Sequence, residues 1–372
     1  MKRPKIIAMY LPQYHSIQEN DKFWGKGFTD WVTVKNAKPL FAGHRQPRIP
    51  LNNNYYDLSI EQNVIWQSKL ARAHGIYGFG VYHYWFNNET NILTRPVEII
   101  RDCNDVDINY FLAWDNANWK RSWSNVEGYD WSPLQDKAIN KNQKNSEPQI
   151  LIPYILGNKE DWENHYRKVS EHFKSKKYIK VDNKPLFIIF NYSSEIEQMC
   201  RFWDKLAKQD GFDGMYFIMK YKKGITNPDV IRTFKYEPVY SGWLRLPLVQ
   251  RLINKIRRTL GIEPVVYKYR YSDVWNKILK NAQIDNHPNI FHSGFVSYDD
   301  TPRRGNRGTV VLGADPNKFG KYLQQLLEIT AEQNKEFLFI TAWNEWGEGA
   351  MLEPDVDNKF SFLESISVSK SL

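Results

Sequence analysis

The stretch Phe337-Leu338-Phe339-Ile340-Thr341-Ala342-Trp343-Asn344-Glu345-Trp346-Gly347-Glu348-Gly349 joins an apolar run to a turn rich in Trp and Gly. The apolar run predicts a buried strand. The strand ends abruptly in two carboxylates that lie three positions apart. Polar side chains directly after a buried strand are typical of the active-site end of a parallel α/β barrel.

Similar apolar segments recur along the whole chain and alternate with helical periodicity, which predicts a parallel α/β sheet. We expect strands at residues 5–10, 78–82, 110–114, 186–191, 215–219, 238–241, 290–296 and 337–342, and helices at 59–74, 95–104, 159–174, 195–209, 273–281 and 316–333. Eight strands with crossover helices predict one (β/α)₈ TIM-like barrel that comprises all 372 residues, 1–372. Two long βα loops, 12–58 and 116–150, are expected at its C-terminal face.

The two carboxylates of the opening stretch, Glu345 and Glu348, are candidate catalytic residues. In a helical turn they would point the same way, with Cβ atoms roughly 5–6 Å apart. Retaining glycosidases hold their paired carboxyl groups about 5–5.5 Å apart. The neighbouring indoles could raise one pKa and stack on a sugar face. The alternative is a surface loop with two solvated Glu.

Amide, hydroxyl, indole and charged groups follow nearly every expected strand, where a barrel binds its substrate. A lone His there is equally compatible with a structural hydrogen bond, and the acidic pair after the seventh strand with a salt-bridged turn. The substrate-binding candidates are Tyr10, His15, His83, Tyr84, Trp85, Trp114, Asn116, Asn118, Trp119, Asn191, Lys220, Asp299, Asp300, Trp343, Asn344 and Trp346.

The composition favours a carbohydrate ligand and gives no sign of a metal or cofactor. Aromatic residues make up 15% of the chain, which suits sugar stacking as well as an aromatic core. The net charge of +9 favours anionic glycans or lipids, and no nucleic-acid-binding motif accompanies it. The two Cys have no zinc-ligand spacing. Two D-x-D triplets, 105–107 and 355–357, stand where a metal–diphosphate site of a nucleotide-sugar transferase is not expected.

The chain is expected to act in the cytoplasm, because its first residues do not resemble a signal peptide and no apolar run approaches the ~20 residues of a membrane span. Residues 244–260 predict a basic amphipathic helix, with Leu248, Leu252, Ile256 and Leu260 at helical spacing among basic residues. Such a helix is compatible with peripheral contact with an anionic inner membrane, or with an ordinary barrel helix that has a solvated basic face.

Several motifs together resemble the WbsX-type proteins, which are encoded among bacterial O-antigen (lipopolysaccharide) and capsule biosynthesis genes. They are Tyr10-Leu11-Pro12-Gln13-Tyr14-His15, Trp24-Gly25-Lys26-Gly27-Phe28-Thr29-Asp30-Trp31, Gln46-Pro47-Arg48, Tyr82-His83-Tyr84-Trp85-Phe86, Trp114-Asp115-Asn116-Ala117-Asn118-Trp119, Asp299-Asp300-Thr301-Pro302-Arg303-Arg304 and the Trp–Glu stretch quoted first. A more distant likeness, carried mainly by the Glu-x-x-Glu element, is to the family 99 glycoside hydrolases, the endo-α-mannosidases.

The resemblance implies a metal-free (β/α)₈ enzyme that cleaves or transfers a glycosidic bond of a surface polysaccharide or its lipid-linked precursor. It implies that Glu345 removes the proton of the sugar 2-hydroxyl, which then attacks the anomeric carbon to give a 1,2-anhydro sugar. Glu348 would protonate the leaving oxygen and later activate water or another acceptor. Two alternatives stay open: a nucleotide-sugar-dependent glycosyltransferase, which should bind UDP or GDP with a divalent metal, and a non-catalytic glycan-binding protein.

Overall fold

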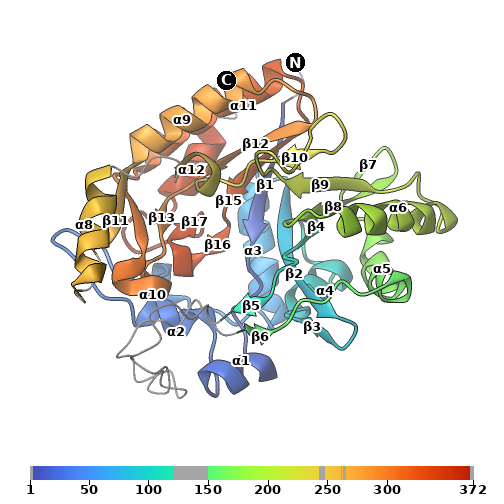
Figure 1. Ribbon diagram of the computed structural model, residues 1–372, viewed down its shortest axis with the longest axis horizontal. Helices are drawn as coiled ribbons and strands as arrows, with labels where there is room; N and C mark the ends of the chain where they lie inside the picture. Colours follow the sequence, from blue (N-terminus) through green and yellow to red (C-terminus); the bar gives the residue numbers. More distant parts are fainter. Residues whose placement is uncertain (1–2, 121–149, 243–247, 261, 263–264, 369–372) are drawn as a thin grey trace.

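A closed barrel of eight parallel strands forms the centre of the computed structural model, which describes residues 3–120, 150–242, 248–260, 262 and 265–368 (Figure 1). Strand β1 pairs with β2 on one side and with β15 on the other, so the sheet closes on itself. This confirms the (β/α)₈ prediction. The barrel strands are β1 (Lys5–Tyr10), β2 (Gly78–Asn87), β4 (Asn109–Trp114), β8 (Lys184–Ile189), β9 (Tyr216–Lys220), β10 (Thr233–Phe234), β12 (Ile290–Phe295) and β15 (Phe337–Thr341).

Helices pack around the strands because one side of each is apolar and buried. Figure 1 shows α5 and α6 on one side of the barrel and α9 and α11 on another. Side chains that accept backbone N–H groups cap several of these helices at the N-terminus: Asn158 caps α5, Ser193 caps α6 and Asp315 caps α11. The outer helices are α3 (Glu61–Ala73), α4 (Arg95–Asp102), α5 (Lys159–Phe173), α6 (Ser194–Gln209), α9 (Tyr271–Ile284), α11 (Pro316–Glu332) and α12 (Ser361–Val368).

The sixth strand differs from the sequence prediction. Residues 238–241 were expected to form it, but the strand is β10, and the helical turn α7 (Val239–Gly242) occupies that position. Pro238 has no N–H for a sheet ladder. The Glu237 carboxylate accepts the Ser241 backbone N–H at 2.8 Å and so stabilises the turn. The connection between β9 and β10 consists of turns without a helix.

Short elements from the long connections add to the barrel. The first connection contributes α1 (Gln18–Trp24) and α2 (Asp30–Lys35); residues 121–149 of the second lie outside the described residues. The others are β3 (Thr90–Ile92), β5 (Trp119–Lys120), β6 (Ile150–Ile152), β7 (Lys180–Val181), α8 (Leu248–Thr259), β11 (Tyr267–Arg270), β13 (Tyr298–Asp299), α10 (Thr301–Arg304), β14 (Thr309–Leu312), β16 (Asn344–Glu345) and β17 (Ala350–Met351), with 3₁₀ turns at Leu51–Asn53, Gly305–Arg307 and Trp346–Glu348.

No helix in the described part of the chain combines the length and apolar character needed to cross a bilayer.

Much of the aromatic content lies in the core. The Trp275 ring is fully buried and stacks on Phe295 and Tyr322, with centroid separations of 5.6 and 5.5 Å. It reaches this position because Gly294 on β12 has no side chain: a Cβ there would lie 2.6 Å from the Trp275 ring. The Trp275 ring is rigid, so it could move away from an added Cβ only by displacing its neighbours.

We predict that Gly294→Ala lowers the free energy of unfolding by about 1–3 kcal/mol, because the added methyl group overpacks the core. Gly242→Ala is the matched control, since its Cβ would meet nothing closer than 3.5 Å. Urea denaturation followed by tryptophan fluorescence measures both variants. Equal stabilities for the two variants would contradict this account of the packing.

Candidate active site

The Trp–Glu stretch forms a compact turn at the carboxyl end of β15. Glu345 lies in β16, which pairs antiparallel with β17, and Trp346–Glu348 form a 3₁₀ turn. The turn ends at Gly349, whose φ of 56° is in the left-handed region that favours glycine. The helical turn expected from the spacing is therefore present as a 3₁₀ turn.

One buried guanidinium holds both carboxylates of this turn. Arg303 of α10 donates from Nη2 to Glu345 Oε1 at 2.6 Å and from Nη1 to Glu348 Oε1 at 2.9 Å. A third acid, Asp30 of α2, accepts from Nη2 at 2.9 Å and from Nε at 3.3 Å. Since both Glu oxygens bind the same planar group, they lie side by side and not turned away from each other.

Gly347 makes this arrangement possible. A Cβ at position 347 would lie 2.5 Å from Arg303 Nε and 2.6 Å from Asp30 Oδ2. Both atoms belong to the buried ion pair, so neither can move away without breaking it. The Gly between the two Glu is therefore a packing requirement of the guanidinium.

Three carboxylates share a single positive charge, so the cluster favours a bound proton. Burial raises the pKa of Glu345 to about 8; Arg303 opposes this shift, while Glu348 and Asp30 add to it. The Glu345 side chain is 5% exposed, whereas that of Glu348 is 23% exposed. Glu345 is thus the proton-holding member, and Glu348 is the one that solvent or a ligand reaches.

A second layer of hydrogen bonds fixes the turn to the barrel. The Tyr14 hydroxyl donates to the Asn344 carbonyl at 2.6 Å and accepts the Trp346 N–H at 3.0 Å. The Asn344 side chain donates to the Leu11 carbonyl at 2.9 Å and accepts the Leu11 N–H at 2.7 Å. The motif after β15 is therefore tied to the end of β1.

A buried carboxylate supports the turn from below. Glu353 accepts hydrogen bonds of 2.7 Å from the Tyr56 hydroxyl, the Gln67 amide and the Trp346 indole N–H. Burial raises its pKa to about 7, and these donors oppose the shift. The indole of Trp346 is thereby held in one orientation beneath the carboxylate pair.

Tyrosine hydroxyls surround the carboxylate pair. Tyr82 and Tyr236 share a hydrogen bond of 2.6 Å between their hydroxyl oxygens. The pKa of Tyr236 is raised well above its usual value by burial and then by the nearby charges of Glu348 and Glu345. Burial and one or both of the same carboxylates raise the pKa of Tyr82, Tyr84 and Tyr298. These neutral hydroxyls are suited to binding sugar hydroxyls.

A charged pair from the third and fifth barrel strands extends the site. Burial raises the pKa of Asp115 to about 6, and Lys220 opposes this. Lys220 lies 5.4 Å from the centroids of both the Phe190 and Tyr236 rings. Burial lowers its pKa, and the charges of Asp115 and Glu348 raise it.

A family model described as glycosyltransferase WbsX matches residues 6–366. The chain belongs to this family. Two relatives, each named uncharacterized protein WxcX, come from strains ATCC 33913 and B100 of Xanthomonas campestris pv. campestris. They are 27% and 28% identical over 370 and 372 residues, which is 97% of this chain. The chain spans about half of their length, 48%.

Solved structures show the same fold as this WbsX family member. The GH99 endo-α-mannosidase of Bacteroides thetaiotaomicron aligns with a TM-score of 0.55 and 14% identity, covering 98% of this chain and 96% of that one. A protein described as glycoside hydrolase-like aligns with a TM-score of 0.57 and 11% identity, covering 99% and 94%. At these identities the likeness is one of fold.

Four predicted binding residues of the WbsX chain are buried. Tyr10 donates to Gln67 at 2.7 Å, and His83 shares a hydrogen bond of 2.9 Å with His165. The Trp114 indole donates to the Trp85 carbonyl at 2.9 Å. Trp343 is fully buried. His83 thus makes the structural hydrogen bond that was weighed as its alternative role, while substrate contact by these four residues stays a prediction.

The polar groups of six further candidates hold loops together. Asn116 and Asn191 bond to each other's backbone, and Asn118 accepts the Tyr154 N–H at 2.7 Å. Asp299 accepts from His44, Gln46 and Thr301, and Asp300 accepts the Thr309 N–H at 2.6 Å. Asn344, with its amide bonded to Leu11, belongs with them. These side chains therefore have partners within the protein, and their contacts with a sugar stay a prediction.

The remaining candidates are His15, Tyr84, Trp85, Trp119, Lys220 and Trp346. Trp119 stacks on Tyr84 at 6.0 Å, and Trp85 stacks on His165 at 4.4 Å. His15 is buried, and its Nδ1 has no hydrogen-bond partner among the described residues. The structure thus brings Tyr84, Lys220 and Trp346 close to the two Glu, while a contact of the others with substrate stays a prediction.

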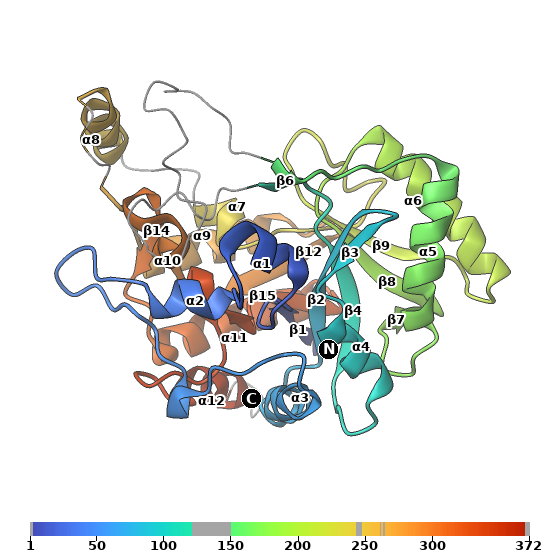
Figure 2. The same ribbon diagram turned by 90° about the horizontal axis from the view of Figure 1, so that it is seen from below.

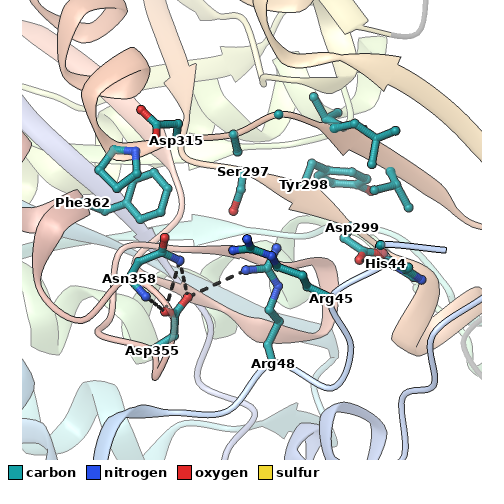
Figure 3. Close-up of a pocket in the computed structure, with 17 residues that line it drawn as sticks. His44, Arg45, Arg48, Ser297, Tyr298, Asp299, Asp315, Asp355, Asn358 and Phe362 are labelled. Atoms are coloured by element: carbon teal, nitrogen blue, oxygen red, sulfur yellow. Dashed lines mark hydrogen bonds and ion pairs between the residues drawn. The ribbon is translucent and has the colours of Figure 1, made fainter. Parts of the chain in front are cut away.

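A polar cleft of about 310 Å³ lies beside Tyr298 and Asp299 (Figure 3). Arg45 and Arg48 extend into it, and Asp355 lines its lower side, where it holds Asn358. Tyr298 lines this cleft, and its pKa is raised by burial and then by the charge of Glu348. The second D-x-D triplet is therefore part of a turn at the cleft.

Sequence reasoning missed the groups that organise the site. Arg303 was weighed only as part of a salt-bridged turn, and Asp30 and Tyr14 stood in motifs quoted for the resemblance. A sequence signal for Asp30 was present, because Asp30 lies next to a Trp, as Glu345 does. Their meeting depends on α2 and α10 approaching the same 3₁₀ turn, as Figure 1 shows for the elements around β16.

We predict that Arg303→Met lowers the free energy of unfolding by about 3–5 kcal/mol at pH 8 by leaving buried carboxylates without a counterion. The raised pKa of Glu345 means that the folded state binds more protons than the unfolded state between about pH 4.5 and 8. Stability from this group is present below that range and is lost as the pH rises through it. The effect of Arg303→Met should therefore be smaller at pH 5.

Urea unfolding at pH 5 and pH 8 tests this, with Arg167→Met as the control. Arg167 is a 46% exposed arginine that also binds two acids, Glu163 and Asp210. Its loss should change stability by roughly 1 kcal/mol or less. A loss for Arg303→Met that is the same at both pH values would refute the shared-charge model.

Proposed function

We propose that this WbsX family member cleaves or transfers a glycosidic bond, with Glu345 and Glu348 as the catalytic pair. The observation that carries the proposal is the pair's geometry: both carboxylates bind one buried guanidinium at the carboxyl end of the last barrel strand. Two adjacent carboxyl groups in different environments, one dry and one partly exposed, are what acid–base chemistry on a sugar requires. The substrate proposed is a bacterial surface polysaccharide or its lipid-linked precursor.

Glu348 is proposed as the acid that protonates the leaving oxygen and then activates the acceptor. Its side chain is partly exposed, and Tyr236 and Lys220 are near enough for their pKa values to respond to its charge. An incoming water or sugar hydroxyl must reach this carboxylate in the second step. Glu345 is less exposed, at 5%, so we assign it the step on the bound sugar's own hydroxyl.

Glu345 is proposed as the base that takes the proton of the sugar 2-hydroxyl. A carboxylate with a pKa near 8 is a stronger base than an ordinary one, which suits a weakly acidic hydroxyl. The proton that Glu345 holds at neutral pH must pass to Glu348 before the reaction, so that Glu348 has a proton to give to the leaving oxygen. Arg303 stabilises the ionised form that results.

Whether water or a second sugar receives the glycosyl group depends on the acceptor site. A sugar hydroxyl bound next to Glu348 would outcompete water through proximity. The family description favours transfer, and the fold shared with endo-α-mannosidases is compatible with hydrolysis. The products formed from the surface polysaccharide of the source bacterium, with and without added acceptor oligosaccharide, distinguish hydrolysis from transfer when they are read by mass spectrometry.

The nucleotide-sugar alternative makes a different prediction. It requires UDP or GDP, with Mn²⁺ or Mg²⁺, to raise the melting temperature. Within the described ranges, no three His, Cys, Asp or Glu side chains are grouped as a metal site. The glycan-binding alternative instead requires Glu348→Gln to retain all function.

We predict that Glu345→Gln and Glu348→Gln each lower turnover at least ~10²-fold, because each removes a proton transfer from the reaction. Glu336→Gln is the matched control. Glu336 precedes β15, at the end of the strand opposite the site, and its carboxylate accepts from Lys5 at 2.8 Å. Initial rates of oligosaccharide release, read by mass spectrometry, measure all three. Undiminished turnover in either site variant would remove the assigned roles.

The pH dependence of kcat/KM tests whether the carboxylate pair carries one proton in its reactive state. If Glu345 is the base and Glu348 the acid, the reactive state carries one proton, on Glu348, so the rate should fall as the pH rises above about 8, the pKa of Glu345, where the pair loses its proton. Glu237→Gln is the control. This acid is also fully buried, and its pKa is raised to about 7, but its carboxylate accepts from Ser241 and is not part of the proposed catalytic pair. A rate that keeps rising above pH 8 would contradict this assignment.

A further inference from the structure

Helix α8 lies at the outer edge of the molecule, clear of the barrel, in both views (Figures 1 and 2). One side chain fixes it to the segment that leads into β11. Asn254 is buried; its Nδ2 donates to the Val265 carbonyl at 2.8 Å, and its Oδ1 accepts the Val265 N–H at 2.8 Å. The helix therefore has one attached face.

The opposite face is apolar and exposed. Successive helical residues turn by about 100°, so positions two before and two after Asn254 project on the other side. Those positions are Leu252 and Ile256, which are 59% and 50% exposed. The same face continues through Leu248, Val249, Ile253 and Leu260, which are 79%, 66%, 45% and 66% exposed.

This concentration of apolar surface differs from the rest of the described surface. Val230 and Ile284, for example, are exposed apolar residues on other segments. Here five exposed apolar residues follow one face of a 12-residue helix, and Leu260 lies directly after it. A continuous apolar face on a soluble chain marks a surface that binds something.

The charge of the segment indicates what that partner is. Residues 238–262 contain five basic residues, Arg245, Arg251, Lys255, Arg257 and Arg258, and no Asp or Glu. Lys255 is exposed. An apolar face accompanied by basic residues only is the pattern of helices that lie in the interface of an anionic bilayer. A helix of 12 residues is about 18 Å long, which suits lying in the interface but not spanning it.

A second copy of the chain fits this surface less well. In a two-fold dimer the same patch meets itself, so the basic segments of both copies would face each other. No acidic residue of the segment could offset that repulsion. Anionic headgroups supply the missing negative charge.

We propose that α8 docks the protein on an anionic lipid bilayer: its apolar face enters the interface, and its basic residues bind the headgroups. The docking is independent of the chemistry proposed for the two Glu. It would bring the enzyme to the surface where lipid-linked glycans are found.

Vesicle co-sedimentation tests the proposal on the full chain, with phosphatidylcholine vesicles that contain or lack phosphatidylglycerol. The wild type should bind the anionic vesicles and not the neutral ones. Leu252→Ser with Ile256→Ser should weaken binding at least tenfold. Lys255→Gln should weaken it about fivefold, as expected for the loss of one cation near the surface.

Val230→Ser with Ile284→Ser is the matched control, because these apolar residues are equally exposed, at 70% and 65%, but lie elsewhere. It should bind like the wild type. Unchanged melting temperatures confirm that the variants are folded. Absent binding by the wild type, or full binding by the double α8 variant, overturns the proposal. A dimer in sedimentation equilibrium that the α8 variant abolishes would assign the face to a second copy instead.

Discussion

The guanidinium of Arg303, buried against three carboxylates, is the interaction on which the site depends. Asp30, Glu345 and Glu348 all approach it within 2.6–2.9 Å. Desolvation of so many charges is tolerated only where each is paired and hydrogen-bonded. Because one cation cannot neutralise three anions, the cluster favours a proton on Glu345, whose pKa burial raises, and proton exchange becomes a built-in property of the turn.

The surrounding structure serves to keep that cluster in place. Gly347 leaves room for the guanidinium, Tyr14 bonds to two backbone groups of the turn, and Glu353 orients the indole of Trp346. These contacts come from segments that are hundreds of residues apart in sequence. The closed barrel brings them together, since β15 pairs with β1 and the loops of both strands leave at the same end.

The apolar periodicity predicted the barrel because buried parallel strands are continuous apolar runs separated by amphipathic helices. It failed at the sixth strand, where only Thr233 and Phe234 pair with their neighbours. Two paired residues are too few to produce a pattern. The roles of side chains at strand ends could not be predicted, because sequence does not distinguish a hydroxyl or amide that faces a ligand from one that bonds to a neighbouring loop, as Asn116 and Asn191 do.

The sequence by itself determined the eightfold alternation, the position of Glu345 and Glu348 after the last strand, and the basic apolar segment at residues 244–260. All of these are local patterns, set by neighbours within a few positions. Only the tertiary structure decided that Arg303 and Asp30 meet the two Glu, that His83 is a core residue, and that the apolar face of α8 points outward. Charge pairing and burial depend on which distant segments approach, and chain closure, not local spacing, sets that approach.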